Sequence, residues 1–219
     1  MTLTDYESPF TLCPELEEKH LEVLSKMILT VVEITLMSHS TPYDDKYTLE
    51  TSLFGRIRQL FIQLGKADNF PWVKLPSQTM DYVPTICNVP VRIFKDDPHN
   101  PKKLKVFFQN NCEQHQHSLM FEQNEAFPIE SITWRILIQE PATEINKDSE
   151  LEDIEDDYHV MLVGYDSITK SIISMWRSEA NTRAAVISDF DELPKEIPVE
   201  RNPIHKKSSD NIIEFPKNE

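Results

Sequence analysis

The spacing of the apolar residues changes near residue 70. Up to Gly65, apolar side chains recur every three or four positions, which predicts amphipathic helices. After Trp72 they gather in short runs separated by proline, asparagine and aspartate, which predicts strands. Helices followed by strands are typical of an α+β domain whose helices cover one face of a sheet.

Two N-terminal helices are expected, over residues 14–38 and 48–65, after an irregular lead-in over residues 1–12. Pro14 fits the first turn of a helix, where its missing N–H would have no partner in any case. In the second helix we expect Thr48 as the N-cap and Gly65 as a left-handed C-cap. The two helices should form a hairpin or a crossed pair.

The strands are expected between residues 82 and 177, in three hairpin-like pairs. The predicted pairs are Val89–Phe94 with Leu104–Gln109, His117–Glu122 with Ser131–Gln139, and Tyr158–Tyr165 with Ser171–Trp176. Parallel strands need long crossovers, and no helix of that length is predicted between these runs. The sequence therefore predicts a mainly antiparallel, hairpin-built sheet. The run from Tyr158 to Tyr165 is apolar on both faces, which indicates a central strand covered on both sides.

Two segments are expected outside the core. Residues 140–157 contain nine acidic residues and one basic residue, Lys147, which predicts a mobile acidic loop. Residues 189–219 combine prolines with charges and few apolar residues, which predicts a disordered, flexible tail. We therefore expect one α+β domain over residues 1–188 and a tail over residues 189–219.

Composition narrows the classes of function. The 219 residues include only three glycines, whereas Rossmann and P-loop phosphate sites need several. A net charge of −15 disfavours direct nucleic-acid binding and favours a basic protein partner. Three cysteines, no apolar run near ~20 residues and no signal-peptide pattern predict a cytoplasmic protein without a membrane span.

One cluster has the donor types of a metal site. Cys112, His115 and His117 supply the thiolate and imidazole groups that zinc prefers. On an extended segment His115 and His117 would share one side, and Cys87 or His159 could add a further ligand. A zinc site is one interpretation of this pattern. Polar loop residues without a metal are the simpler one, and on that interpretation no cofactor is expected.

Two features predict contacts with a partner. Trp72 lies between Pro71 and Val73 in a predicted loop, and tryptophan is enriched in the energetic centres of interfaces. Ile212, Ile213 and Phe215 form an apolar cluster in the charged tail. Such a cluster can dock by strand addition or in a groove, or it can fold back on its own domain.

These features predict a non-catalytic interaction protein that binds a protein partner, such as a regulator, an adaptor, an inhibitor or an immunity-type factor. Two alternatives remain open. The first is a metal-dependent hydrolase or nuclease that uses Cys112, His115 and His117. The second is mimicry of nucleic-acid charge by the acidic residues 140–157.

Overall fold

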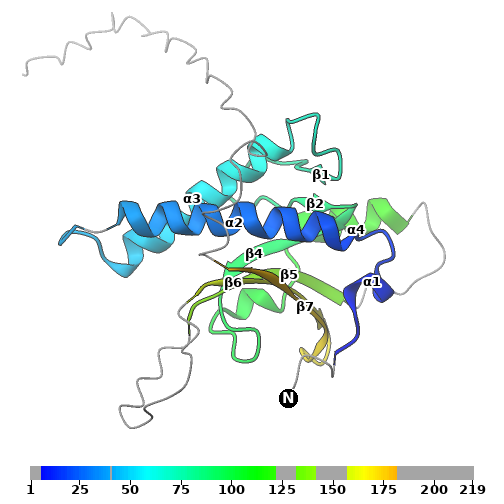
Figure 1. Ribbon diagram of the computed structural model, residues 1–219. Coiled ribbons are helices and arrows are strands. Elements are labelled where there is room, and N and C mark those ends of the chain that lie inside the picture. Colours follow the sequence, from blue (N-terminus) through cyan, green and yellow to red (C-terminus); the bar gives the residue numbers. More distant parts are fainter. Residues whose placement is uncertain (1–5, 40, 122–131, 142–156, 182–219) are drawn as a thin grey trace, which may run out of the picture.

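The computed structural model describes residues 6–39, 41–121, 132–141 and 157–181. Two long helices lie across one face of a four-stranded sheet (Figure 1). A turn-rich segment between Pro98 and Glu113 covers the other face. The expected α+β class is confirmed. The tail predicted over residues 189–219 and most of the acidic loop predicted over residues 140–157 lie outside the described residues.

The N-terminal helices start differently from the prediction. The helices are α1 (Pro9–Leu12), α2 (Glu18–Ser38), α3 (Lys46–Leu64), the 3-10 helix η2 (Leu104–Val106) and α4 (Asn111–Phe121). Ser8 caps α1 by accepting a hydrogen bond from the N–H of Phe10, and the chain then turns to bury Cys13 and Leu16. That turn includes Pro14, so α2 cannot begin there. None of the described helices has the length and apolarity that crossing a bilayer requires.

The start of α3 is set by a reciprocal capping pair. The N–H of Thr48 donates to Oδ1 of Asp45 over 2.7 Å, and the N–H of Asp45 donates to Oγ1 of Thr48 over 2.9 Å. Asp45 is therefore the N-cap and Thr48 lies inside the first turn, which corrects the prediction. Gly65 does end the helix, but its φ of −68° is right-handed, so the expected left-handed cap is wrong.

The main sheet has the strand order β4-β5-β6-β7, and a smaller sheet has the order β1-β2-β3. The strands are β1 (Val73–Lys74), β2 (Thr85–Ile86), β3 (Val89–Pro90), β4 (Arg92–Lys95), β5 (Ile132–Gln139), β6 (His159–Asp166) and β7 (Ile172–Asn181). All neighbouring pairs are antiparallel except β4 and β5, which are parallel. The third predicted hairpin is confirmed as β6–β7, where Asp166 accepts the N–H groups of Ile168 and Thr169 in the turn.

The other two predicted hairpins are wrong. The carboxylate of Asp96 accepts the N–H groups of Lys102 and Lys103 over 3.0 Å each, which turns the chain, and η2 follows where a return strand was expected. The strand predicted from His117 is part of α4. Because η2 and α4 lie in the connection from β4 to β5, that connection is a crossover and the two strands run parallel.

The sheet separates two apolar layers. The layer toward α2 and α3 includes Trp134, Ile136 and Ile138 of β5, and the opposite layer includes Leu137, Met161 and Val163. β6 lies between two neighbouring strands and is buried on both faces, as the sequence predicted. Each fully buried aliphatic side chain contributes about 1.5–3 kcal/mol to stability, so both layers matter to the fold.

A buried ion pair attaches α4 to the sheet. Arg135 of β5 is fully buried, and its guanidinium donates to both carboxylate oxygens of Glu113. It also donates to the carbonyl oxygens of Val106 over 2.8 Å and of Phe108 over 2.9 Å. Glu113 in turn accepts the N–H of Asn110 over 2.9 Å, which caps α4. The pair therefore fixes a helix and a turn against one strand.

We predict that Glu113→Gln lowers the free energy of unfolding by about 3 kcal/mol or more, because it leaves the buried Arg135 without its counter-charge. Denaturant unfolding followed by circular dichroism measures the change. Glu17→Gln is the matched control, since Glu17 pairs with Lys19 on the exposed surface and its loss should have no measurable effect. A loss below about 1 kcal/mol for Glu113→Gln would contradict the prediction.

We also predict opposite effects for alanine at two glycines. A Cβ at Gly164 would lie 2.9 Å from Cζ3 of Trp134, whereas a Cβ at Gly55 meets nothing within 4 Å. Gly164→Ala should therefore destabilise the protein by about 1–3 kcal/mol through overpacking. Gly55→Ala should stabilise it by about 0.5–1 kcal/mol through helix propensity. Thermal unfolding of both variants tests the pair, and shifts of the same sign would refute it.

Candidate functional site

The predicted metal ligands lie on a helix rather than on an extended segment. Cys112, His115 and His117 all belong to α4. Residues three apart share a helix face and residues two apart do not, so Cys112 and His115 lie on one face and the residue at 117 lies on another. The expectation that His115 and His117 share one side is therefore wrong. In the part of the chain that the structure describes, no three Cys, His, Asp or Glu residues gather closely enough to hold a metal ion.

Trp72 contributes to an aromatic cluster beside the smaller sheet. Its ring stacks on His20, with centroids 4.6 Å apart, and meets Phe70 edge-on. The Sγ atom of Cys87 lies 3.5 Å from Nδ1 of His20. Burial raises the pKa of the Cys87 thiol, which disfavours the thiolate needed for nucleophilic chemistry. Trp72 is half-buried, so its role in binding a partner stays a prediction. Ile212, Ile213 and Phe215 lie outside the described residues.

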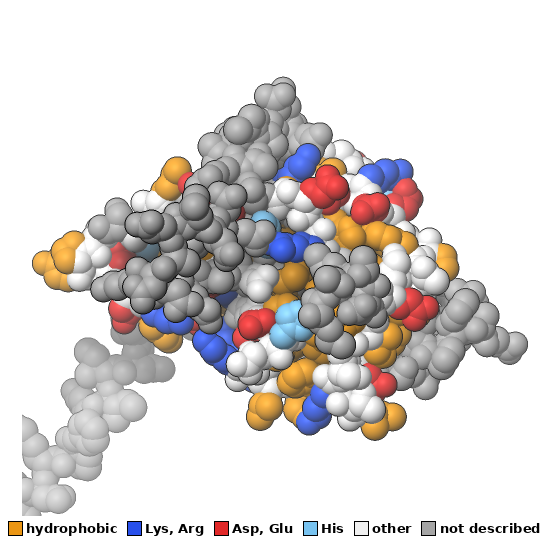
Figure 2. Space-filling model, turned by 60° about the horizontal axis from the view of Figure 1, so that its bottom comes forward, with side chains coloured by type: hydrophobic (Ala, Val, Ile, Leu, Met, Phe, Trp, Pro, Cys, Tyr) orange, Lys and Arg blue, Asp and Glu red, His pale blue; other side chains and the backbone are white. Residues whose placement is uncertain are grey.

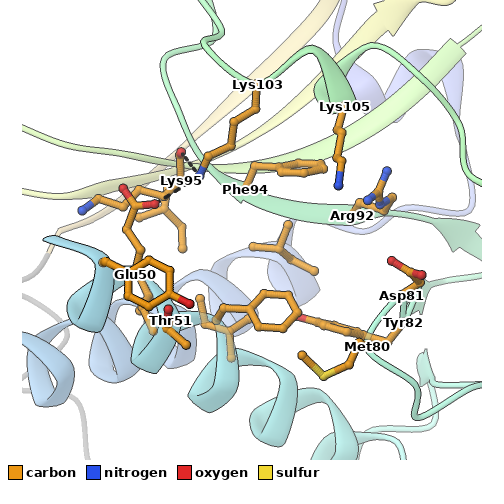
Figure 3. A pocket seen from close by; sticks show the side chains of 16 residues that line it. Glu50, Thr51, Met80, Asp81, Tyr82, Arg92, Phe94, Lys95, Lys103 and Lys105 are labelled. Atoms are coloured by element: carbon orange, nitrogen blue, oxygen red, sulfur yellow. Dashed lines mark hydrogen bonds and ion pairs between the residues drawn. The ribbon is translucent and has the colours of Figure 1, made fainter.

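A groove of about 420 Å³ lies between α3 and β4 (Figure 3). Its lower wall in the figure is α3, its middle is β4, and its upper wall is the segment with η2. Residues from these elements and from the segment 80–82 line it: Tyr47, Glu50, Thr51, Leu53, Phe54, Ile57, Met80, Asp81, Tyr82, Arg92, Ile93, Phe94, Lys95, Lys103, Lys105 and Ile138. Five separate parts of the chain, the last of them Ile138 of β5, thus form one site.

Large apolar side chains stand exposed along the α3 wall. Tyr47 and Phe54 are 76% and 37% exposed, and Met80 at the groove end is 67% exposed. Tyr47 and Phe54 are seven residues apart on α3, so they lie on the same helix face. Beneath them the buried side chains Leu53 and Ile57 form an apolar floor. This wall can bury aromatic or aliphatic groups of a ligand.

The opposite wall carries positive charge. The guanidinium of Arg92 lies 4.9 Å from the ring centre of Phe94 and 3.8 Å from Oε2 of Glu113. The Nζ atom of Lys103 lies 3.7 Å from a carboxylate oxygen of Glu50 and donates to the carbonyl oxygen of Lys95 over 3.4 Å. Lys105 points into the groove (Figure 3) and makes no ion pair with any described residue. Four basic residues therefore face two acidic ones, Glu50 and Asp81, across this groove.

Beyond Lys95 the groove continues into a second hollow of about 330 Å³, where the charges are more nearly balanced. The Nζ atom of Lys95 lies 2.5 Å from Oε1 of Glu140 and 5.6 Å from the ring centre of Tyr158. Burial alone would raise the pKa of the Glu140 carboxyl, but the hydrogen bond and charge of Lys95 outweigh burial and hold that pKa below its usual value. The excess of basic over acidic lining residues is therefore concentrated in the first part of the groove, where Lys105 makes no ion pair with any described residue.

The described domain is much less acidic than the whole chain. The described residues include 18 acidic and 15 basic side chains, so their net charge is −3, against −15 for all 219 residues. Figure 2 shows acidic and basic side chains interspersed on one face, with apolar ones between them. The strongly acidic surface that the composition predicts is therefore not a property of the described domain, and the groove is a local excess of positive charge.

Comparison with known proteins does not assign a role to this groove. Models of protein families, curated proteins and solved structures gave no significant match to the chain. The function of the site therefore has to be inferred from its side chains and backbone. Sequence reasoning did not find these residues, because Phe54, Arg92 and Lys105 belong to segments with no shared motif.

We predict that Lys95→Met raises the pKa of Glu140, because burial is then opposed only by the weaker effects of the charges on Lys46 and Lys102. In the native protein the lowered pKa means that this pair stabilises the fold above the unfolded-state pKa, and that the stabilisation is lost as the pH falls through the folded-state pKa. An NMR titration of the Glu140 carboxyl measures the shift. Lys66→Met is the control, and an unchanged titration in Lys95→Met would disprove the assignment.

Proposed function

We propose that this chain is a non-catalytic interaction protein that binds an acidic peptide segment of a protein partner in the groove between α3 and β4. The observation that supports the proposal is the combination of exposed aromatic side chains on one wall and an excess of basic over acidic side chains on the other, where Lys105 makes no ion pair with any described residue. Regulators, adaptors and inhibitors all use sites of this kind. The peptide that fits has acidic side chains and at least one aromatic or aliphatic anchor.

The two walls would contribute in different ways. Aromatic side chains at an interface bury large areas, so Tyr47 and Phe54 would supply affinity for apolar anchors. Arg92, Lys103 and Lys105 would orient the peptide and accelerate its approach, an effect that weakens as ionic strength rises. Arg92 already pairs with Glu113 over 3.8 Å, whereas Lys105 makes no ion pair with any described residue, so Lys105 is the best candidate for direct contact with an acidic side chain.

The charge of the whole chain favours a short peptide over a nucleic acid. A long polyanion would meet the chain's net charge of −15, whereas a short acidic peptide meets mainly the local positive charge of the groove. The basic partner expected from the sequence rests on the net charge of −15 and on residues 140–157, most of which lie outside the described part of the chain. It stays a separate prediction.

We also propose a cytoplasmic location, because Cys13, Cys87 and Cys112 are all free thiols.

The test is a fluorescence anisotropy titration of the full chain with a short fluorescein-labelled peptide in which glutamates flank a phenylalanine. Lys105→Glu should weaken binding at least about tenfold, since it replaces an attraction with a repulsion. Phe54→Ala should also weaken binding by about tenfold, through loss of the apolar contact.

Lys66→Glu provides the matched control. It makes the same change in net charge just beyond α3, and Lys66 does not line the groove. Its effect on affinity should stay below about twofold, because exposed charges beyond the Debye length are screened. Equal losses for Lys66→Glu and Lys105→Glu would indicate non-specific attraction and would refute binding in the groove.

A further inference from the structure

The groove contains one open edge of the main sheet. β4 is the last strand of the order β4-β5-β6-β7, and no described strand pairs with its other side. All four residues of β4 line the groove, although successive side chains of a strand point to opposite faces. A groove that touches both faces of a strand must run along its edge. The backbone of β4 is therefore presented to whatever the groove binds.

The hydrogen bonds show which backbone groups face the groove. The N–H of Asp96 donates to the carbonyl oxygen of Ile138 in β5 over 3.3 Å. Backbone groups alternate sides along a strand, so Arg92 and Phe94 also face β5, while Ile93 and Lys95 face the groove. The hydrogen bond from Lys103 Nζ to the Lys95 carbonyl oxygen agrees with this direction. The N–H and C=O of Ile93 and the N–H of Lys95 thus have no partner among the described residues.

We infer that the bound peptide is held as an added strand beside β4, an inference that rests on the proposed function and specifies its partner. An incoming strand would take the free donors and acceptor of Ile93 and Lys95 as a short ladder. Strand addition of this kind gives affinity through the main chain and specificity through alternate side chains. The partner is then an extended segment and not a helix.

The two faces of β4 define the sequence that such a strand should have. Ile93 packs on the side of α2 and α3, where Phe54 and Ile57 also lie. Arg92 and Phe94 point to the other side, which is the side of Lys105 (Figure 3). In an added strand, side chains toward α3 meet apolar groups and side chains toward Lys105 meet positive charge. The segment recognised is therefore one in which apolar and acidic residues alternate.

Positive charge on this edge also disfavours pairing with the β4 strand of a second copy of this chain. Lysine on an open edge hinders pairing between identical edges, because two copies would bring like charges together. Across a β4–β4 contact the two groove linings would repel each other, because each has four basic residues and two acidic ones. An incoming acidic strand would instead be attracted by these basic side chains. The edge is therefore suited to a partner's acidic segment and poorly suited to a second copy of this chain.

The test uses a fluorescein-labelled peptide that alternates glutamate with phenylalanine and leucine, and a series of versions in which each backbone nitrogen in turn carries a methyl group. N-methylation removes one N–H donor, so positions that face β4 should lose about tenfold or more in affinity. Positions between them should change little. The expected result is a loss that repeats every second residue, read by anisotropy with the full chain.

Two controls separate this inference from the proposed function. A peptide of equal composition with its glutamates in one block should bind at least about tenfold more weakly than the alternating one. If the methyl scan shows no alternation while Lys105→Glu still weakens binding, strand addition is wrong and the groove still binds acidic peptides. If the alternating peptide does not bind the wild-type chain at all, the proposed function fails as well.

A last variant tests the identity of the occupant. The C-terminal segment contains Ile213 and Phe215 on either side of an acidic residue, so it also alternates. In the full chain, changing both to alanine should leave the affinity for the added peptide unchanged. A rise of about tenfold would mean that the chain's own segment competes for the β4 edge, which would overturn the assignment to a partner.

Discussion

The buried pair of Arg135 and Glu113 is the interaction on which the rest of the structure depends. A guanidinium inside a protein loses its hydration, and this loss is tolerated only where a counter-charge and further acceptors replace the water. Glu113 and the carbonyl oxygens of Val106, Phe108 and Trp134 provide that replacement. One side chain of β5 therefore positions both the helix α4 and the turn that follows η2.

The groove depends indirectly on the pair of Arg135 and Glu113. Val106 is fully buried and bonded to Arg135, and Lys105 is its neighbour in η2. Through Val106, the pair of Arg135 and Glu113 therefore fixes the position of Lys105 above β4. The parallel pairing of β4 with β5 also helps to position Lys105. Parallel strands require a crossover connection, and this crossover carries η2 and α4 over the sheet. β4 is also the last strand of the main sheet, so its far side has no described strand and forms the open edge within the groove.

Local signals predicted the parts of the fold that local physics determines. The apolar stripes of α2 and α3 and the Asp166 turn of the β6–β7 hairpin are encoded in neighbouring residues, and these elements are confirmed. α4 was missed because its residues are mostly polar and give little helical periodicity. The spacing of Asn110 and Glu113 is that of a capping box and could have revealed its start.

The candidate site could not be predicted in the same way. Tyr47 and Phe54 precede Arg92 and Lys105 by a long stretch of chain, and their proximity exists only after α3 and η2 pack on either side of β4. The exposed backbone of Ile93 is likewise a result of strand order, which no short pattern encodes. Residues that the sequence did single out, such as Cys112 and Trp72, owe their surroundings to helix α4 and to the stacking on His20.

The uneven distribution of charge along the chain affects how copies of this protein repel one another. The isoelectric point of about 4.9 is an average over a nearly neutral domain and strongly acidic segments. The described residues carry a net charge of −3, so the other residues carry the remaining −12. At neutral pH the charge repulsion between copies therefore comes mainly from residues outside the described domain, and this repulsion favours colloidal solubility.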